Sequence, residues 1–533
     1  MTHILKLGTR KSLLALAQSR AIARQLEQNN TDLTIELVGI ETRGDRILDV
    51  PLSKMEGKEF FVAELDKALL DGEVDFTVHS MKDLSLERPK EIGLGAIPER
   101  ENPRDVVLFA PDIIDRLRSG GPVRLGTSSP RRIENVPPFL AKALPQSGAA
   151  PQIVTDEIRG NVNTRISYLS LPDDDPKKLD AVVLAFAGLI RLWNSADGRR
   201  ELEVLLAGVR WMVLPLRECP AAPAQGALAL ECRANDQTTL NYLAGIHSPQ
   251  TAAAVRQERK LLEGSGGGCH QRFGATVEKY TELGSLLFVH GRDAEGLRLS
   301  EVRWQPDADE QKRNSDVLPT PGWDGSQWRD ASFTSHYLTD LAQPEWDVRG
   351  KRDNGQALFI AHSRALPDDW SESLANSDQR VWTAGTQSWY RLAALGIWVE
   401  GCTEEIGFDA FRRTFEQDIL RLPAIKDWTV LTHSGGRTTW PCDHVIATYE
   451  VTPAESLNEH NEAVLALREA KSIFWTSGSQ YDAFREWVPD SCAHACRYGK
   501  TYNYLRDQLN PAKIISLTTY PSAAHWQAML KKN

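Results

Sequence analysis

The stretch "KLGTRKSLLALAQSRAIARQLE", residues 6–27, decides the fold class of the N-terminal half. A short predicted strand leads through a basic turn into an amphipathic helix. Ser12 is the expected N-cap, because a serine hydroxyl accepts from the free N–H groups of a first turn. Strands are predicted to alternate with helices up to about residue 220, at 35–40, 74–80, 123–129 and 181–188. This alternation predicts an α/β fold.

Composition limits what the chain can be. Its 533 residues exceed one hydrophobic core and predict about three or four folding units. A net charge of −10 argues against nucleic-acid binding, and no apolar run approaches the ~18 residues of a membrane span. The N-terminal residues lack a signal peptide's apolar core, and seven cysteines without a framework spacing favour reduced thiols. We therefore expect a cytoplasmic protein that binds neither nucleic acid nor membrane.

Basic and hydroxyl side chains recur where the predicted strands end. "GTRKS" holds Arg10 and Ser12, "GTSSPRR" holds Thr127, Ser128, Ser129, Arg131 and Arg132, "IRGNVNTR" holds Arg159, Gly160 and Arg165, and "AGLIRLW" holds Arg191. Helix N-termini and guanidinium groups both bind carboxylates and phosphates. Any one of these arginines is as readily explained as a solvated surface residue, but their recurrence favours a cleft for a polyanion. The absence of GxxxxGK[ST] makes a nucleotide phosphate the less favoured anion.

Two further features concern single reactive groups. "VHSMKDL" ends a predicted strand with Lys82 and Asp83, where a carboxylate can act as general acid or base or stabilise a cation; a loop ion pair is the alternative. "EGSGGGCHQRFGA", residues 263–275, puts Cys269 behind four glycines. A thiol on such a loop is a nucleophile, a metal ligand, a covalent tether or a bystander. The metal interpretation is the weakest of the first three, because no second cysteine stands at ligand spacing, and we expect no metal.

Eight motifs carry a resemblance to one family. They are "GTRKS", "HSMKDL", "PRDVVL", "GTSSPRR", "RGNVNTR", "AGLIRL", "AAPAQGAL" and "GGGCHQRFGA". In order and approximate spacing they resemble porphobilinogen deaminase (hydroxymethylbilane synthase) over residues 4–304. The resemblance implies two periplasmic-binding-protein-like lobes, formed by 1–100 with 200–218 and by 101–199. It also implies a small α/β domain, 219–305, that carries Cys269.

The resemblance also implies a chemistry. Cys269 would hold a dipyrromethane cofactor through a thioether, and four porphobilinogen molecules would be joined with loss of ammonia to a linear tetrapyrrole. Asp83 would be the catalytic carboxylate, with Lys82 beside it. Cofactor contacts are expected from Cys269, Ser12, Lys82, Asp83, Thr127, Ser128, Ser129, Arg131, Arg132, Arg159, Gly160 and Arg165. Substrate contacts are expected from Arg10, Ser12, Lys54, Phe61, Arg159, Arg165, Arg191 and Gln225. Residues 43–61 match the family's mobile loop, and Lys58 is a further expected contact there.

The rest of the chain divides into a polar stretch and a second α/β region. Residues 306–354 are rich in Pro, Gly and Asp and are interpreted as a linker or a degraded domain edge. Residues 355–533 resemble uroporphyrinogen-III synthase, which is bilobal and closes the linear tetrapyrrole. Its opening strand–helix unit is expected to be absent or replaced by 306–354. Tyr449 matches the residue proposed to assist loss of the hydroxyl, Ser477, Ser479 and Thr501 match cleft hydroxyls, and Lys500 replaces a common proline.

Three functional interpretations follow. The first is a monomeric bifunctional enzyme, a transferase and lyase of tetrapyrrole biosynthesis that acts on porphobilinogen and linear tetrapyrroles. The second keeps the deaminase and makes the C-terminal region a non-catalytic module. The third is a carboxylate-binding solute receptor or sensor, against which the glycine-flanked Cys269 argues. "CAHAC", residues 492–496, is interpreted as an incidental cysteine pair.

Overall fold

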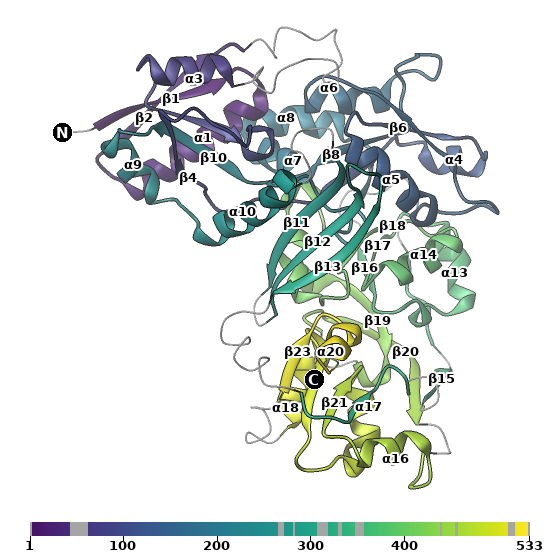
Figure 1. Ribbon diagram of the computed structural model, residues 1–533. Helices are drawn as coiled ribbons and strands as arrows, with labels where there is room; N and C mark the ends of the chain where they lie inside the picture. Colours follow the sequence, from purple (N-terminus) through teal and green to yellow (C-terminus); the bar gives the residue numbers. More distant parts are fainter. Residues whose placement is uncertain are drawn as a thin grey trace. The chain divides into compact units, whose positions relative to one another are not determined.

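The computed structural model divides the chain into two compact units (Figure 1). The N-terminal unit contains Met1–Val277 and Leu287–Val302, and the C-terminal unit contains Glu278–Leu286 and Arg303–Asn533. The structure describes residues 3–42, 62–264, 271–280, 283–305, 318–328, 333–339, 341–346, 356–436, 440–453, 457–509 and 517–530. Lys54, Lys58, Phe61 and Cys269 therefore lie outside the described residues.

The first sheet of the N-terminal unit has the strand order β2-β1-β3-β10-β4. Its strands are β1 (His3–Arg10), β2 (Leu33–Ile40), β3 (Phe76–Ser80), β4 (Ile92–Ala96) and β10 (Leu228–Arg233), with helices α1 (Leu13–Asn29), α3 (Ala63–Leu70) and α9 (Gln237–Ala244). Ser12 caps α1, its Oγ accepting from the Ala15 amide at 3.4 Å, as predicted. Leu7, Leu26 and Phe76 are buried in the core beneath α1.

The second sheet has the order β7-β6-β8-β5-β9. It contains β5 (Asp105–Phe109), β6 (Val123–Gly126), β7 (Ile153–Asp156), β8 (Ala181–Ala185) and β9 (Arg210–Val213), with helices α4 (Ile113–Arg118), α5 (Pro130–Ala143), α6 (Val162–Ser167), α7 (Phe186–Trp193) and α8 (Ala196–Leu205). Every residue of β5 is buried, which is typical of an inner strand covered on both faces. The predicted α/β alternation is therefore confirmed for both sheets.

Two predicted domain boundaries were wrong. Residues 200–218 were expected in the first lobe, but β9 pairs antiparallel with β5 in the second sheet. The first sheet instead receives β10, which was expected in the small domain 219–305 but pairs antiparallel with β3 and β4. The reason is topological: in each sheet the antiparallel strand is the one formed just after the chain crosses from the other sheet, β5 in the second sheet and β10 in the first. The chain thus returns to the first sheet only after residue 213.

A third sheet has the order β11-β12-β13. It is formed by β11 (Arg272–Tyr280), β12 (Gly284–Arg292) and β13 (Arg298–Gln305), so the strand–turn–strand predicted over 286–304 is confirmed. Helix α10 (Pro249–Gly264), predicted over 251–263, packs Ala254 and Leu261 against this sheet's apolar cluster around Phe273.

The C-terminal unit contains two further sheets, and Figure 1 shows both with their helices. The six-stranded sheet has the order β15-β20-β19-β16-β17-β18, with β15 (Phe333–Tyr337), β16 (Ala357–Ile360), β17 (Arg380–Thr383), β18 (Val399–Cys402), β19 (Thr429–His433) and β20 (His444–Pro453). The four-stranded sheet has the order β14-β21-β22-β23, with β14 (Gly322–Asp324), β21 (Ser472–Trp475), β22 (Ala493–Arg497) and β23 (Leu517–Tyr520). The helices are α13 (Asp368–Ala375), α14 (Thr386–Ala394), α15 (Arg412–Phe415), α16 (Glu462–Arg468), α17 (Gly478–Phe484), α18 (Lys500–Gln508) and α20 (Ala523–Leu530).

The described part of 306–354 is not a linker. β14 pairs parallel with β21, and β15 pairs antiparallel with β20, so each is the edge strand of a sheet. An edge strand tolerates the polar composition of this stretch because one side faces solvent. Of the two interpretations of 306–354, the domain edge is therefore the one that fits the structure. The opening strand of the C-terminal region, expected to be absent or replaced by 306–354, is present within this stretch.

Candidate active site

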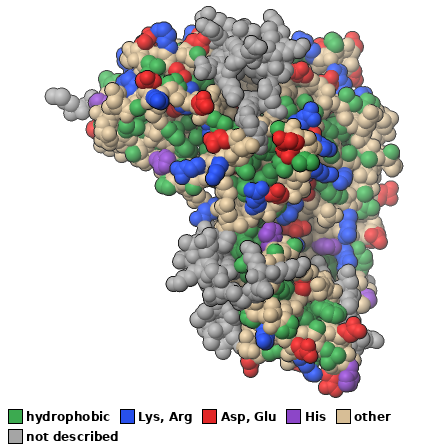
Figure 2. All heavy atoms as spheres, in the orientation of Figure 1, with side chains coloured by type: hydrophobic (Ala, Val, Ile, Leu, Met, Phe, Trp, Pro, Cys, Tyr) green, Lys and Arg blue, Asp and Glu red, His purple; other side chains and the backbone are tan. Residues whose placement is uncertain are grey.

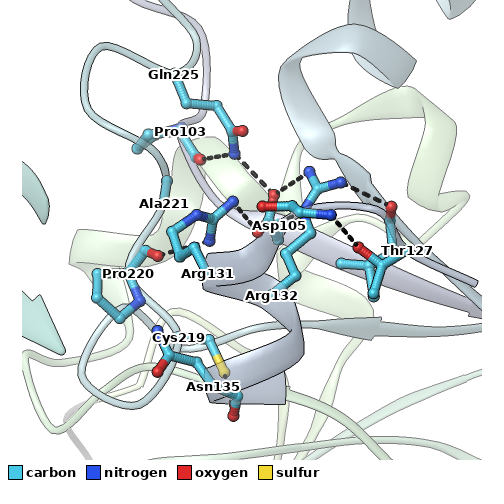
Figure 3. A network of polar contacts seen from close by, with 12 residues as sticks. Pro103, Asp105, Thr127, Arg131, Arg132, Asn135, Cys219, Pro220, Ala221 and Gln225 are labelled. Carbon is cyan, nitrogen blue, oxygen red and sulfur yellow. Dashed lines mark hydrogen bonds and ion pairs between the residues drawn. The ribbon is translucent and has the colours of Figure 1, made fainter. Parts of the chain in front are cut away.

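Asp105 is the centre of a buried ionic network in the N-terminal unit (Figure 3). It begins β5, and both of its oxygens accept from Arg132, at 3.1 Å from Nε and 2.7 Å from Nη2. Arg131 adds a contact of 2.8 Å from Nη2. Burial alone raises the pKa of Asp105, but the two guanidinium groups outweigh it and hold that pKa well below its ordinary value. Asp105 therefore stays ionised and fixes both arginines.

Both arginines also donate to main-chain carbonyls, at 2.7 Å from Arg131 to Pro220 and at 3.0 Å from Arg132 to Val183. They were predicted to hold cofactor carboxylates, yet the structure directs most of their donors to protein acceptors. Among the described residues, Nε of Arg131 has no hydrogen-bond partner although it is buried. That nitrogen is a buried donor whose hydrogen bond is not satisfied by the described residues.

Gln225 connects this network to Lys82. Its amide nitrogen donates to Asp105 at 2.8 Å and to the Pro103 carbonyl at 2.7 Å, and its amide oxygen accepts from Lys82 Nζ at 3.2 Å. The side chain is buried, and its loop has positive φ at Ala224 and Gly226, of 65° and 87°. Gln225 was predicted as a substrate contact, whereas here it joins protein groups to one another.

Lys82 and Asp83 lie on a single 3₁₀ turn, η2 (Met81–Asp83), which directly follows β3. Met81 and Leu84 are buried, Lys82 is partly buried and Asp83 is exposed. Burial lowers the pKa of Lys82, and Arg132 and Arg131 lower it further against the opposing effect of Asp83 and Asp105. The structure therefore brings the predicted carboxylate and lysine into the field of the Asp105 network.

Arg165 adds a third segment to the cluster. It lies on α6 and donates from Nε to the Gly160 carbonyl at 2.9 Å. Its pKa is lowered to about 10, chiefly by burial and also by Arg132 and Arg159, while Asp83 opposes the shift. Arg132, Arg159, Arg165 and Asp83, distant in sequence, therefore lie within electrostatic reach of one another. Gly160 has φ +105°, which favours glycine because a Cβ there would meet the Thr164 side chain.

The predicted hydroxyls serve the local loops. Ser128 Oγ donates to the Ile158 carbonyl and accepts from the Ile158 amide at 3.0 Å. Thr127 Oγ1 accepts from the Ser129 amide at 3.3 Å. Ser129 is the N-cap residue of α5, but its side chain makes no capping hydrogen bond. Although Ser129 stands at the N-cap position, its hydroxyl group is therefore not used to cap α5.

Arg10 and Arg191 lie at other strand and helix ends. Arg10 ends β1, and the pKa of His79 is lowered first by burial and then by Arg88 and Arg10. Arg191 donates from Nη2 to the Gly226 carbonyl at 2.6 Å, and burial lowers its pKa to about 10. Arg191 thereby links α7 to the loop that carries Gln225.

The described cluster fits an anionic group. Lys82, Arg131, Arg132, Arg159 and Arg165 outnumber its carboxylates, Asp83 and Asp105. Burial is the main cause of the lowered pKa values of Lys82 and Arg165, and repulsion from the neighbouring arginines lowers both further. A ligand carrying several carboxylates would relieve this repulsion. On the face drawn in Figure 2, basic and acidic side chains are interspersed.

Among the described residues, a second ionic cluster is the one group with metal-ligand geometry. Asp66, His79 and Glu231 are buried and bring three potential ligand atoms within 4.8 Å of one another. Arg88 already contacts both acids, at 2.6 Å from Asp66 and 2.7 Å from Glu231. The guanidinium group thus supplies the positive charge that these carboxylates need.

Within the described residues, no helix combines the length and apolarity that crossing a bilayer requires.

In the C-terminal unit, Tyr449 lies within a strand, and the other predicted polar residues follow strand ends. Tyr449 is buried on β20, with its ring centroid 5.9 Å from that of His433 on β19. Ser477 caps α17 by accepting from the Gln480 amide at 3.1 Å, and Thr501 Oγ1 donates to the Thr476 carbonyl at 3.5 Å. Ser479 is partly buried on the first turn of α17.

Lys500 is an unusual cation at the start of α18. Its Nζ lies over the indole ring of Trp440 and, among the described residues, has no hydrogen-bond partner. Burial lowers the pKa of Lys500 to about 6, opposed by Asp409 and by Cys442. The sequence had singled out Lys500 only as a replacement for proline. The aromatic group beneath it, in which Trp440 packs against Phe359 and Phe408, is non-local and was not predicted.

Comparison with known proteins identifies the N-terminal unit. Residues 5–241 match the family model described as porphobilinogen deaminase, dipyromethane cofactor binding domain. The porphobilinogen deaminase of Geobacter metallireducens is 42% identical over 265 residues, which cover 50% of this chain and 74% of the relative. That of Syntrophotalea carbinolica is 38% identical over 335 residues, which cover 60% of this chain and 98% of the relative.

Solved structures give weaker likenesses. The BenM effector binding domain with its effector benzoate is 15% identical with a TM-score of 0.25, covering 49% of this chain and 93% of that one. A Candida albicans protein described as having the generic periplasmic binding protein fold is 11% identical with a TM-score of 0.22, covering 50% and 73%. The assignment rests instead on the two sequence relatives and the family model. By these matches, the chain belongs to the porphobilinogen deaminase family.

Proposed function

We propose that Asp83 is the catalytic carboxylate of the porphobilinogen deaminase activity, and that the surrounding cations bind the acidic arms of substrate and cofactor. The observation that carries this is the contrast between two carboxylates in one positive field. Asp105 is buried and saturated by arginines, whereas Asp83 is exposed on η2. An exposed carboxylate among cations can approach a reacting pyrrole, and its negative charge stabilises a cation that forms there.

The cofactor fits the described residues. The open Nε of Arg131 and the excess of cations suit a group that carries several carboxylates. Ser129, Arg131, Arg159 and Arg165 would hold it, with Cys269 as its covalent attachment. When bound, dipyrromethane supplies the terminal pyrrole carbon to which the first substrate is joined.

The chain's own groups divide the remaining work. Arg165 and Lys82 neutralise and orient substrate carboxylates, and burial makes each ionic contact stronger than it would be in water. Asp83 receives a hydrogen bond from the reacting pyrrole nitrogen and favours departure of ammonia, because positive charge then develops on the ring. Asp105 takes no part in proton transfer, since its low pKa keeps it ionised.

Attachment and activity can be tested together. The intact mass of the wild-type protein should exceed that of its polypeptide by one dipyrromethane, and Ehrlich's reagent should colour the denatured protein. Cys269→Ser should lose both signals and consume no porphobilinogen. Asp83→Asn should retain the added mass but lose most turnover. A wild-type protein with no added mass that also fails to consume porphobilinogen after preincubation with it would contradict the proposal.

We also propose that the C-terminal unit cyclises hydroxymethylbilane to uroporphyrinogen III. Its support is the topology: β15 and β20 form an antiparallel pair at one edge of the six-stranded sheet, and the chain continues from β20 into the four-stranded sheet. Ser477 and Ser479 follow β21 and Thr501 follows β22, at strand ends where ligands of open α/β sheets bind, while Tyr449 lies within β20.

The alternative, a non-catalytic C-terminal module, predicts a different product. Chromatography of the oxidised products made from porphobilinogen separates the type I and type III isomers. The bifunctional enzyme should give mainly type III, because enzymatic closure precedes spontaneous closure. Type I alone would contradict cyclisation while leaving the deaminase proposal intact. Tyr449→Phe should shift the product toward type I without slowing porphobilinogen consumption.

A further inference from the structure

We propose that Arg259 is a positioning residue for Asp83, so that helix α10 sets the place of the catalytic carboxylate. This inference rests on the role proposed for Asp83. Arg259 lies in the last two turns of α10, which ends at Gly264, five residues before Cys269. One helix would then lead toward the cofactor's cysteine and also fix the group that acts on the substrate.

Arg259 binds the main chain on both sides of Asp83. Its Nη1 donates to the carbonyl of Met81 at 3.1 Å and to that of Leu84 at 3.3 Å. Its Nη2 donates to the carbonyl of Ser85 at 2.8 Å. A single planar guanidinium group therefore spans the turn that presents Asp83. A fork of this geometry fixes direction as well as distance, which a lysine ammonium cannot do.

The side chains of the turn that carries Asp83 do not themselves fix its orientation. Met81 and Leu84 point inward and join a buried cluster with Ala252 and Val255 of α10. Lys82 and Asp83, between them, are more exposed. Apolar contacts hold the turn against α10 but set no precise orientation, because they are not directional. The hydrogen bonds from Arg259 supply that orientation.

The neighbouring residue binds the other side of the site. Glu258 is buried and accepts from Arg100 at 2.6 and 3.0 Å, and from the Ala224 amide at 2.6 Å. Arg100 in turn donates to the Gln225 carbonyl at 2.8 Å. Consecutive residues of α10 thus hold the Gln225 loop and η2, the two segments joined by the hydrogen bond from Lys82 to Gln225. Arg259 is the one of the two that contacts the turn of Asp83.

The test uses three single variants of the full-length holoprotein. Arg259→Met keeps the length and apolar stem of the side chain but removes every donor. Arg259→Lys keeps the charge but loses the fork. Arg256→Ala is the control, because Arg256 is exposed on the same helix. Initial rates of porphobilinogen consumption are expressed per molecule of attached dipyrromethane, measured by intact mass, so that incomplete loading does not count as lost turnover.

We expect Arg259→Met to lower kcat about 10- to 100-fold with KM changed less than about threefold, since removing a positioning contact acts on the transition state. Arg259→Lys should fall between it and wild type, and Arg256→Ala should equal wild type. Asp83→Glu, which keeps a carboxylate but misplaces it, supplies the second arm. Combining it with Arg259→Met should cost little beyond Asp83→Glu alone, because both disturb the same placement.

The outcomes separate the two ideas. If Asp83→Glu leaves kcat unchanged, the proposed role of Asp83 fails. If Asp83→Glu lowers kcat while the Arg259 variants match Arg256→Ala, the positioning role fails and that of Asp83 stands. Fully multiplicative losses in the double variant would also overturn it, since they indicate a general structural effect. If Arg259→Met does not fold, Arg259→Lys decides alone, and wild-type kcat in that variant refutes the inference.

Discussion

Asp105→Asn should destabilise the N-terminal unit far more than its small change in size suggests. The carboxylate accepts four hydrogen bonds, three from Arg131 and Arg132 and one from Gln225. An amide offers one acceptor oxygen and turns its NH₂ group toward other donors. Two buried guanidinium groups then lose their counter-charge, and removing one partner of such a buried pair costs about 3–5 kcal/mol.

The sign of the pH dependence follows from the pKa of Asp105, which is lower in the folded than in the unfolded chain. Its stabilisation is complete above the unfolded value, about 3.9, and is lost as the pH falls toward the folded value. The difference between wild type and Asp105→Asn should therefore be constant near neutral pH. It should shrink only below about pH 4.

Hydrogen exchange read on peptides of β5 and β8, with calorimetry of the whole chain, measures the effect. A loss of 3–5 kcal/mol corresponds to a midpoint lower by roughly 10 °C for a unit of this size. Asp197→Asn is the matched control: Asp197 contacts Arg20 at 3.2 Å, but both side chains are about half exposed, at 52% and 50%. Such a pair contributes roughly 0–1 kcal/mol. Equal effects of the two substitutions would refute the reasoning.

Three further predictions concern single residues. Lys500→Met should stabilise the C-terminal unit, because the pKa of Lys500 is lowered to about 6 and protonation of the lysine therefore favours the unfolded chain. The gain in stability should be largest at pH 6 and below and should shrink as the pH rises toward 10.5. Unfolding measured at pH 6 and pH 9 checks this, and a larger gain at pH 9 would contradict it. Arg165→Met should lower kcat/KM about 10- to 100-fold, because it removes a charged contact to the substrate. Arg200→Met, a control on the exposed face of α8, should leave kcat/KM unchanged. An unchanged kcat/KM in Arg165→Met would show that Arg165 does not belong to the site. Ser12→Ala should cost about 1 kcal/mol by uncapping α1, and Ser12→Asp should restore most of it; urea unfolding decides, and equal losses in both variants would contradict a capping role.

What the sequence predicts well is local. Ser12 and α1 were found because an N-cap and an amphipathic period lie within one stretch of chain. β9 and β10 were assigned to the wrong domains because their pairing is decided by distant strands, β5 and β3. β14 and β15 were missed because edge strands with polar residues resemble a linker. Short-range signals carry no information on such partners.

The same distinction applies to the site. The recurrence of arginines at strand ends predicted an anionic ligand, and the structure brings Arg132, Arg159 and Arg165 together. Asp105 was overlooked, although "PRDVVL" was quoted, because a lone acid at the start of a strand has no local signature. Its partners lie 27 residues away at Arg132 and 120 residues away at Gln225. For the same reason, Arg259 became visible only through its contacts with η2.

With the role proposed for Asp83, the two carboxylates of the cluster divide two tasks: Asp105 holds arginines and Asp83 acts on the substrate. Asp105 is sealed beneath two guanidinium groups, and its single charge leaves that group of three with net positive charge. Burial and pairing make it too weak a base to exchange a proton near neutral pH, but they give Arg131 a fixed direction for its open Nε. Asp83 is held through the backbone of its turn, so its own oxygens are not needed to position it. A carboxylate that is held in place without an ion pair keeps its charge available for a cation formed on the substrate. If the environments of Asp105 and Asp83 were exchanged, Arg131 and Arg132 would repel one another, and the carboxylate meant for the substrate would be neutralised by arginines.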